Sequence, residues 1–170
     1  MENQMIEQFE FRTIKQEEAA EAVEIERICF PPHEACTPQR MKSRIAVAAD
    51  LFFVAIDKEN GKMAGFVNGI ATDESKLRDE FYVDASLHDP KGKNVMILGV
   101  DVLPEYRGRG LARELVARYC AREWERNREQ LILTCLSDKV AMYQKFGFRD
   151  LGESMSQWGG EQWHEMVITE

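Results

Sequence analysis

Two glycines and two arginines alternate in the stretch "DVLPEYRGRGLAREL" (101–115), between an apolar run and a run with helical spacing. The first N–H groups of a helix have no partner inside it, and the helix dipole gives that end partial positive charge. Gly108 and Gly110 lack a Cβ, so a ligand can approach the backbone closely, and Arg107 and Arg109 add positive charge. This combination is typical of a phosphate site, and a plain turn with two solvated arginines is the alternative.

Two common phosphate-binding patterns are missing from this stretch. The Walker pattern GxxxxGK[ST] does not occur, and Arg113 stands where the dinucleotide fingerprint GxGxxG needs its last glycine. The sequence therefore disfavours a nucleoside triphosphatase and an NAD-dependent enzyme.

Hydrophobic periodicity predicts the elements that position this turn. The run "NVMILGVDV" (94–102) is nearly continuously apolar, which predicts a strand buried on both faces, and residues 111–120 have the spacing of an amphipathic helix. Asn60-Gly61 predicts a hairpin, and Thr37-Pro38 predicts a helix start. Further strands are expected at 9–15, 51–57, 62–72, 130–136, 148–155 and 162–168, and further helices at about 17–30, 37–49, 77–82 and 137–146. This order predicts one α/β domain over residues 1–170, a mixed sheet covered by helices.

Composition and charge exclude several classes of protein. A net charge of −8 argues against a nucleic-acid-binding surface, and no apolar run is long enough to cross a membrane. The N-terminus lacks the pattern of a signal peptide. The four cysteines form no CxxC pair, so we expect a cytoplasmic protein. The three histidines are scattered and no HExxH motif occurs, so no metal site is expected.

Two motifs carry a resemblance to a known family. The stretch "LGVDVLPEYRGRGLARELV" resembles motif A, [RQ]-x-x-G-x-[GA], of the GNAT superfamily of acetyl-CoA-dependent N-acetyltransferases, and "AMYQKFGF" resembles its second signature. The segments "EIERICFPPHEACTPQRM", "LHDPKGKN" and "WHEM" resemble the arylalkylamine (serotonin) N-acetyltransferase branch, so the likeness extends over nearly the whole chain. It implies a mostly antiparallel sheet with two central parallel strands splayed apart and helices on both faces. It also implies acetyl transfer to a primary amine, by direct attack in a ternary complex.

The resemblance assigns roles to particular residues. In this family the acetyl-CoA pyrophosphate binds backbone N–H groups of the turn, and the pantetheine arm pairs with the strand before it. Tyr143 matches the family's tyrosine acid, which protonates the leaving thiolate, and an aromatic residue of the core is the alternative. The cofactor-binding residues are then expected to be Leu98, Val100, Asp101, Val102, Arg107, Gly108, Arg109, Gly110, Leu111, Ala112 and Tyr143.

The resemblance does not identify a general base in this chain. Relatives place a histidine or glutamate where this chain has Met96 and Leu98, neither of which can accept a proton. The base must therefore be a water chain or a group from another element. Candidates are His33 and Glu34 in the loop "PPHEAC", with an exposed loop surface as the alternative reading. We expect Glu24 and Glu26 to lie on the solvated face of the first helix, and attraction of a cationic amine is the alternative.

The acceptor is the least defined part of the prediction. A small-molecule amine is the leading partner, with no nucleic acid and no membrane, and the protein is expected to be a monomer or a homodimer. A protein or peptide N-acetyltransferase and a non-catalytic acyl-CoA-binding module are the alternatives. Six aromatic residues either line an amine pocket or belong to the core: Phe52, Phe53, Phe66, Phe81, Tyr82 and Trp158.

Overall fold

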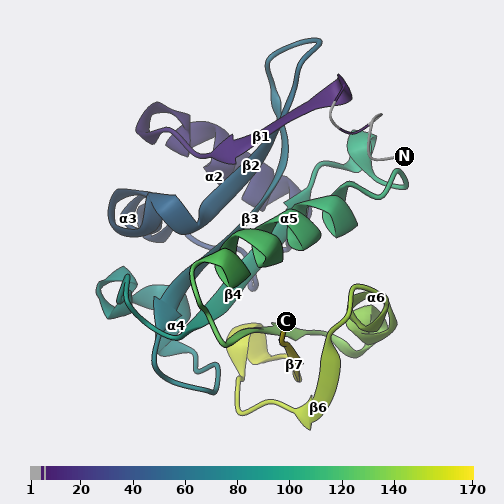
Figure 1. The fold of residues 1–170 in the computed structure, drawn as a ribbon. Helices are drawn as coiled ribbons and strands as arrows, with labels where there is room; N and C mark the ends of the chain where they lie inside the picture. Colours follow the sequence, from purple (N-terminus) through teal and green to yellow (C-terminus); the bar gives the residue numbers. More distant parts are fainter. Residues whose placement is uncertain (1–4, 6) are drawn as a thin grey trace.

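A single seven-stranded sheet organises the computed structural model, which describes residue 5 and residues 7–170. Its order is β1-β2-β3-β4-β5-β7-β6, and every neighbouring pair is antiparallel except β4 and β5 (Figure 1). The strands are β1 (Phe9–Thr13), β2 (Phe52–Asp57), β3 (Met63–Thr72), β4 (Asn94–Val102), β5 (Gln130–Cys135), β6 (Arg149–Glu153) and β7 (His164–Ile168). The predicted mixed, mostly antiparallel sheet is confirmed.

Helices cover both faces of this sheet. On one face lie α2 (Ala19–Cys29), α3 (Pro38–Ala48) and the short α4 (Glu80–Val83), and on the other lies α5 (Leu111–Glu125) (Figure 1). The remaining α6 (Val140–Lys145) connects β5 to β6. Short 3-10 turns occur at Gln16–Glu18, Ala49–Leu51, Ala85–Leu87, Pro104–Tyr106, Ser137–Lys139 and Trp158–Gly160.

Local sequence explains where several elements begin and turn. The Thr37 side chain accepts a hydrogen bond from the backbone N–H of Arg40 at 3.3 Å, and Pro38 opens α3, as predicted. Gly61 has a φ of +73° in the connection between β2 and β3, which confirms the predicted hairpin.

Strand β2 contributes side chains to two hydrophobic cores, one on each face of the sheet. Phe53 and Ala55 pack into the cluster under α5, whereas Phe52 and Val54 pack into the cluster under α2 and α3. Because successive side chains of a strand point to opposite faces, a strand covered on both sides is apolar throughout. Of the six aromatic residues considered above, Phe52, Phe53 and Phe66 belong to these two cores, and Phe81 belongs to a third.

A β-bulge interrupts β4 near its middle. Asn68 of β3 pairs with Gly99, and Gly69 pairs with Ile97, so Leu98 is an extra residue on β4. One extra residue reverses the alternation of side chains beyond it. Ile97 before the bulge and Val102 after it therefore both pack on the α5 side.

The parallel pair β4–β5 separates after three residue pairs. Pairing runs from Asn94–Gln130 to Met96–Ile132 and stops there, although both strands continue. This confirms the two central parallel strands that splay apart.

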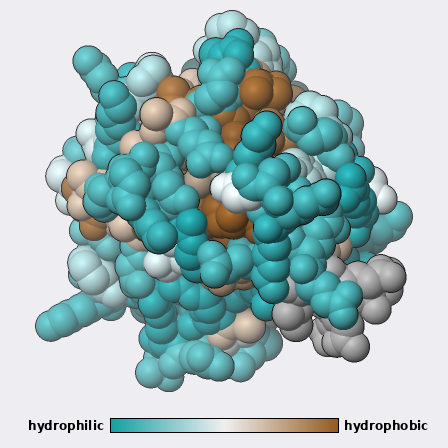
Figure 2. Space-filling model, turned by 90° about the horizontal axis from the view of Figure 1, so that it is seen from above, coloured by the Kyte–Doolittle hydropathy of each residue, from teal (hydrophilic) through white to brown (hydrophobic). Residues whose placement is uncertain are grey.

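The outer surface fits the high content of charged residues, which is 31%. Figure 2 shows one face of the molecule, where hydrophilic side chains cover most of the area and hydrophobic ones gather in small regions between them. In the described part of the chain, no helix combines the length and the hydropathy needed to cross a membrane.

Candidate functional site

A cavity of about 710 Å³ lies where β4 and β5 separate. Its walls come from these two strands, from the glycine-arginine turn before α5, and from α6. The loop between α2 and α3 and the loop between β6 and β7 complete it. The cavity therefore joins the predicted phosphate turn to the loops that border the predicted acceptor site.

The turn offers bare backbone at a helix start. Gly108 and Gly110 have φ values of +79° and +83°, which favour glycine. Among the residues that the structure describes, a Cβ on Gly108 would meet no atom within 4 Å, and one on Gly110 would meet only the Met5 methyl at 3.8 Å. Gly110 is the N-cap of α5, so the next N–H groups have no helical partner. The turn thus fits a diphosphate group such as that of coenzyme A.

The arginines of the turn have different surroundings. Arg107 lines the cavity, and its Nε donates to the Val102 carbonyl at 2.9 Å. Arg109 instead lies over the ring of Tyr106, 5.5 Å from its centroid, and donates to the Glu105 carbonyl. A third arginine, Arg113 in the first turn of α5, also lines the cavity. The predicted cofactor-binding residues that line the cavity are Leu98, Val100, Val102, Arg107, Gly108, Gly110, Leu111, Ala112 and Tyr143, whereas Asp101 and Arg109 do not.

Two carboxyl groups are buried together behind the bulge of β4. Glu26 on α2 is 6% exposed and lines the cavity, and Asp101 on β4 is 1% exposed. A Cβ on Gly99 would lie 3.2 Å from an Asp101 oxygen and 3.8 Å from a Glu26 oxygen, so both groups converge over the bulge. The expectation that Glu26 is solvated is wrong. Glu24 is exposed and pairs with Arg27, as expected for that face.

The two carboxyl groups have different partners. Glu26 Oε2 accepts the backbone N–H of Cys36 at 2.8 Å, but neither oxygen of Asp101 has a hydrogen-bond donor among the described residues. Burial, and then the charge of Glu26, raise the pKa of Asp101 well above its usual range. Asp101 therefore keeps its proton to higher pH than a free aspartate does.

A buried arginine stands beside the pair. Arg44 on α3 donates to Asn68 Oδ1 at 3.2 Å and to the Tyr82 carbonyl at 2.8 Å. Its charge opposes the rise in the pKa of Asp101. Arg44 therefore places a positive charge beside the pair, which reduces the cost of burying carboxyl groups there.

The proton on Asp101 has a measurable effect on stability. An unfolded aspartate loses its proton at a pKa of about 3.9, whereas folded Asp101 keeps it to higher pH. Its contribution to the free energy of unfolding is therefore full below pH ~4 and is lost as pH rises toward the folded pKa. We expect Asp101→Asn, which mimics the protonated form, to weaken the fall in melting temperature between pH 5 and 8. Glu125→Gln, on the exposed side of α5, is the control, and parallel pH curves for wild type and Asp101→Asn would contradict the raised pKa of Asp101.

Tyr143 on α6 places a hydroxyl at the cavity. Its residue is 8% exposed, and its ring packs edge-on against Phe146 and Phe148 at 5.6 and 5.7 Å. Burial raises the pKa of Tyr143, so the hydroxyl keeps its proton at neutral pH. No hydrogen bond to this hydroxyl occurs among residues 5 and 7–170, which leaves it available as a donor.

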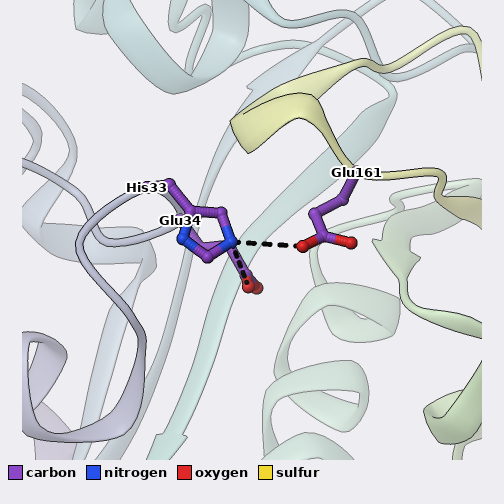
Figure 3. Close-up of side chains that lie close together, drawn as sticks. All are labelled: His33, Glu34 and Glu161. Carbon is purple, nitrogen blue, oxygen red and sulfur yellow. Dashed lines mark hydrogen bonds and ion pairs between the residues drawn. The ribbon is translucent and has the colours of Figure 1, made fainter.

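Glu34, His33 and Glu161 come together at the cavity rim (Figure 3). His33 Nε2 lies 3.3 Å from a Glu34 oxygen and 3.1 Å from a Glu161 oxygen. The Glu34 side chain is 10% exposed and lines the cavity, whereas the His33 side chain is 49% exposed and is not part of the wall. These residue types can bind metals. The contacts present are between His33 and Glu161 of the other loop and between His33 and Glu34 of its own loop.

Two aromatic residues of the acceptor region do line the cavity. Tyr82 and Trp158 stack with their centroids 4.8 Å apart, and Trp158 Nε1 donates to the Glu34 carbonyl at 2.9 Å. Sequence reasoning left their location open, and it missed Glu26 as a wall residue. Helical spacing could have identified Glu26 as buried, because it follows Ala22 by four residues and Ala22 is fully buried on α2.

Several solved structures share the fold of this chain. A GNAT-like decarboxylase, GphF, in complex with isobutyryl-CoA superposes with a TM-score of 0.78 at 15% identity, over 94% of this chain and 98% of that one. A phosphinothricin acetyltransferase from Sinorhizobium meliloti in complex with AcCoA gives 0.68 at 16% identity, over 95% and 88%. The ribosomal-protein-S18-alanine N-acetyltransferase from Escherichia coli gives 0.65 at 18%, over 95% and 93%. These similarities show the fold, and the model of the acetyltransferase (GNAT) family matches residues 19–148, so the chain belongs to that family.

Proposed function

We propose that this protein transfers an acetyl group from acetyl-CoA to a small primary amine, in the manner of the arylalkylamine branch. The observation that carries the proposal is the Glu26–Asp101 pair, which lies over the bulge of β4 where the parallel strands separate. It supplies a proton acceptor in a chain that lacks one at Met96 and Leu98.

Glu26 is the proposed general base. A free alkylamine has a pKa of about 10.4, so a proton must leave before its nitrogen can attack. When bound, acetyl-CoA supplies a thioester carbonyl that the neutral amine attacks, with release of the CoA thiol. Glu26 takes the amine proton, and Asp101 beside it keeps its own proton. The Cys36 N–H provides a fixed donor to the Glu26 carboxylate.

Hydrogen-bond donors on β4 and α6 stabilise the negative charge that develops on the thioester oxygen and on the leaving sulfur. Backbone N–H groups of β4 beyond Met96 have lost β5 as a partner and are available to a developing oxyanion. Tyr143 is the proposed donor to the leaving sulfur. Since its raised pKa keeps the hydroxyl protonated, it is always present as a hydrogen-bond donor.

Direct attack is favoured over an acyl-cysteine intermediate. Cys29 and Cys36 both line the cavity, which would allow a covalent route. Burial raises the pKa of both thiols, however, and the thiolate is the nucleophilic form. We therefore propose a ternary complex of protein, acetyl-CoA and amine.

Three other functions fit the site less well: decarboxylation, acetylation of a peptide, and binding of acyl-CoA without catalysis. Decarboxylation requires a carboxylate on the acyl group, and Glu26 would repel it. A peptide acceptor requires an open groove, whereas the two loops at the rim are joined by contacts of Glu34 and His33. A non-catalytic acyl-CoA module would not need a buried pair of carboxyl groups, which costs stability.

An acceptor screen tests the proposal. Purified protein with acetyl-CoA is offered alkylamines, arylalkylamines, amino acids and short peptides, and thiol release is followed together with the mass of the product. We expect acetylated primary amines and no decarboxylation of malonyl-CoA. Thiol release with peptides alone would favour the protein acetyltransferase, and no release with any acceptor would favour the binding module.

Replacement of Tyr143 by phenylalanine tests the proposed acid. Tyr143→Phe keeps the ring packing but removes the donor to the sulfur, so we expect turnover to fall about a hundredfold with unchanged CoA affinity. Tyr119→Phe is the matched control, because the Tyr119 hydroxyl donates to the Leu51 carbonyl at 2.9 Å and the residue does not line the cavity. Wild-type turnover in Tyr143→Phe would leave Tyr143 as a packing residue only.

A further inference from the structure

The acceptor end of the cavity contains a second acidic group besides Glu26. Burial raises the pKa of Glu34, and the charges of Glu161 and Asp138 raise it further. Among the described residues, His33 is the only basic group that lowers it. Glu34 is therefore a largely buried carboxyl group with little compensating positive charge, a state that a cationic ligand would relieve.

The geometry at the rim leaves hydrogen-bond acceptors unused. His33 Nε2 faces both Glu34 and Glu161, at 3.3 and 3.1 Å (Figure 3). One ring nitrogen carries at most one proton, so it cannot satisfy both carboxylates equally. An alkylammonium has three donors and could bind both.

Aromatic rings lie beside these carboxyl groups. The Trp158 backbone and ring are tied to the Glu34 loop through the Nε1–carbonyl bond, and its ring stacks on Tyr82. Such a wall accommodates methylene groups, and Arg40, which lies over the Trp158 ring 5.7 Å from its centroid, shows that a cation fits against it. In the part of the chain that the structure describes, four cationic side chains line the cavity. Arg107 and Arg113 belong to the turn, Arg44 is bonded to Asn68 and Tyr82, and Lys139 lies beside α6. None of these provides a partner for Glu34.

We propose that the acceptor carries a second cationic group, as in a diaminoalkane, and that Glu34 and Glu161 bind it while the other amine reaches Glu26. This inference rests on the proposed amine acetylation and adds the chemistry of the distal end of the substrate. It makes Glu34 a specificity-determining residue, distinct from the base. It also predicts that a distal carboxylate is rejected, because Glu34 and Glu161 would repel it.

The test compares acceptors that differ only at the distal end. Values of kcat/KM are measured with EDTA present for 1,5-diaminopentane, pentylamine, tyramine and 5-aminopentanoate, and diamines with three to six methylene groups then give the preferred length. We expect the diamine to exceed pentylamine by about tenfold or more, as for one hydrogen bond to a charged group, and the amino acid to be poorest. Pentylamine or tyramine equal to or better than the diamines would overturn the inference while leaving amine acetylation intact. No turnover with any amine would overturn both.

Variants separate specificity from proton transfer. Glu34→Gln and Glu161→Gln are expected to lower the ratio of diamine to pentylamine kcat/KM about tenfold. Glu24→Gln, exposed on α2, is the matched control and should keep the wild-type ratio. If Glu34→Gln lowers both acceptors equally, Glu34 acts in the chemistry common to all amines, and its role at the distal cation is refuted.

Discussion

Glu26→Gln is expected to lower turnover by about a hundredfold to ten-thousandfold, the usual contribution of a positioned general base. The amide keeps an oxygen for the Cys36 N–H and has nearly the same volume, so the fold and the cavity should persist. It cannot take a proton from the amine. Steady-state rates with a good acceptor, measured from pH 6 to 9, check both the size of the loss and its dependence on pH.

The control for this variant lies two residues earlier on the same helix. Glu24→Gln removes an exposed carboxylate that pairs with Arg27 and should retain full activity. Calorimetry with CoA should give the same affinity for both variants and wild type, because neither residue belongs to the glycine-arginine turn. If Glu26→Gln turns over at the wild-type rate, the base is another group, and Glu34 or a water chain is the next candidate.

Gly110→Asp is expected to lower CoA affinity at least about a hundredfold without unfolding the protein. A carboxylate about 4 Å from a phosphate charge costs several kcal/mol at the effective dielectric of a protein surface, and each 1.4 kcal/mol is tenfold in affinity. The φ of +83° adds strain for any residue with a Cβ. Calorimetric titration with CoA measures the loss, and a thermal melt confirms the fold.

Gly110→Asn separates charge from shape. Asparagine tolerates positive φ better than most residues and matches aspartate in size, but it is neutral. It should therefore bind CoA more tightly than the aspartate variant. Wild-type affinity in Gly110→Asp would mean that the diphosphate does not bind at this turn.

The turn and its flanking elements could be predicted because they are built from consecutive residues. The strand over 94–102 and the helix from Leu111 follow from local hydrophobic pattern, and the structure has both of them. The order of elements likewise predicted the mixed sheet. These features depend on the rest of the chain only for their position in the sheet.

The carboxyl pair could not be predicted in the same way. Strict alternation along β4 puts Asp101 on the same face as Val95 and Ile97, toward α5. The bulge at Leu98 reverses that alternation and turns Asp101 toward Glu26. No residue type in "NVMILGVDV" signals an extra residue in the pairing with β3, because the bulge is a property of two strands together.

The loops of the acceptor end escaped prediction for another reason. His33, Glu34, Trp158 and Glu161 come from two irregular segments that only the completed sheet brings together. Their contacts are side chain to side chain or side chain to backbone, and have no periodicity. Placement of His33 and Glu34 near the acceptor therefore rested on resemblance. Trp158 was one of the aromatic candidates for the pocket, but the contact with Glu161 was not foreseen.

The gap between β4 and β5 has a thermodynamic consequence. A sheet that opens in its interior exposes two edges to one another, each with backbone groups that lack strand partners. A ligand that fills this gap binds the folded chain and not the unfolded one, so it raises the free energy of unfolding by RT ln(1 + [L]/Kd), about 2.7 kcal/mol at a hundred times Kd. The supply of acyl-CoA in the cell would then set how long the protein survives proteolysis as well as how fast it works.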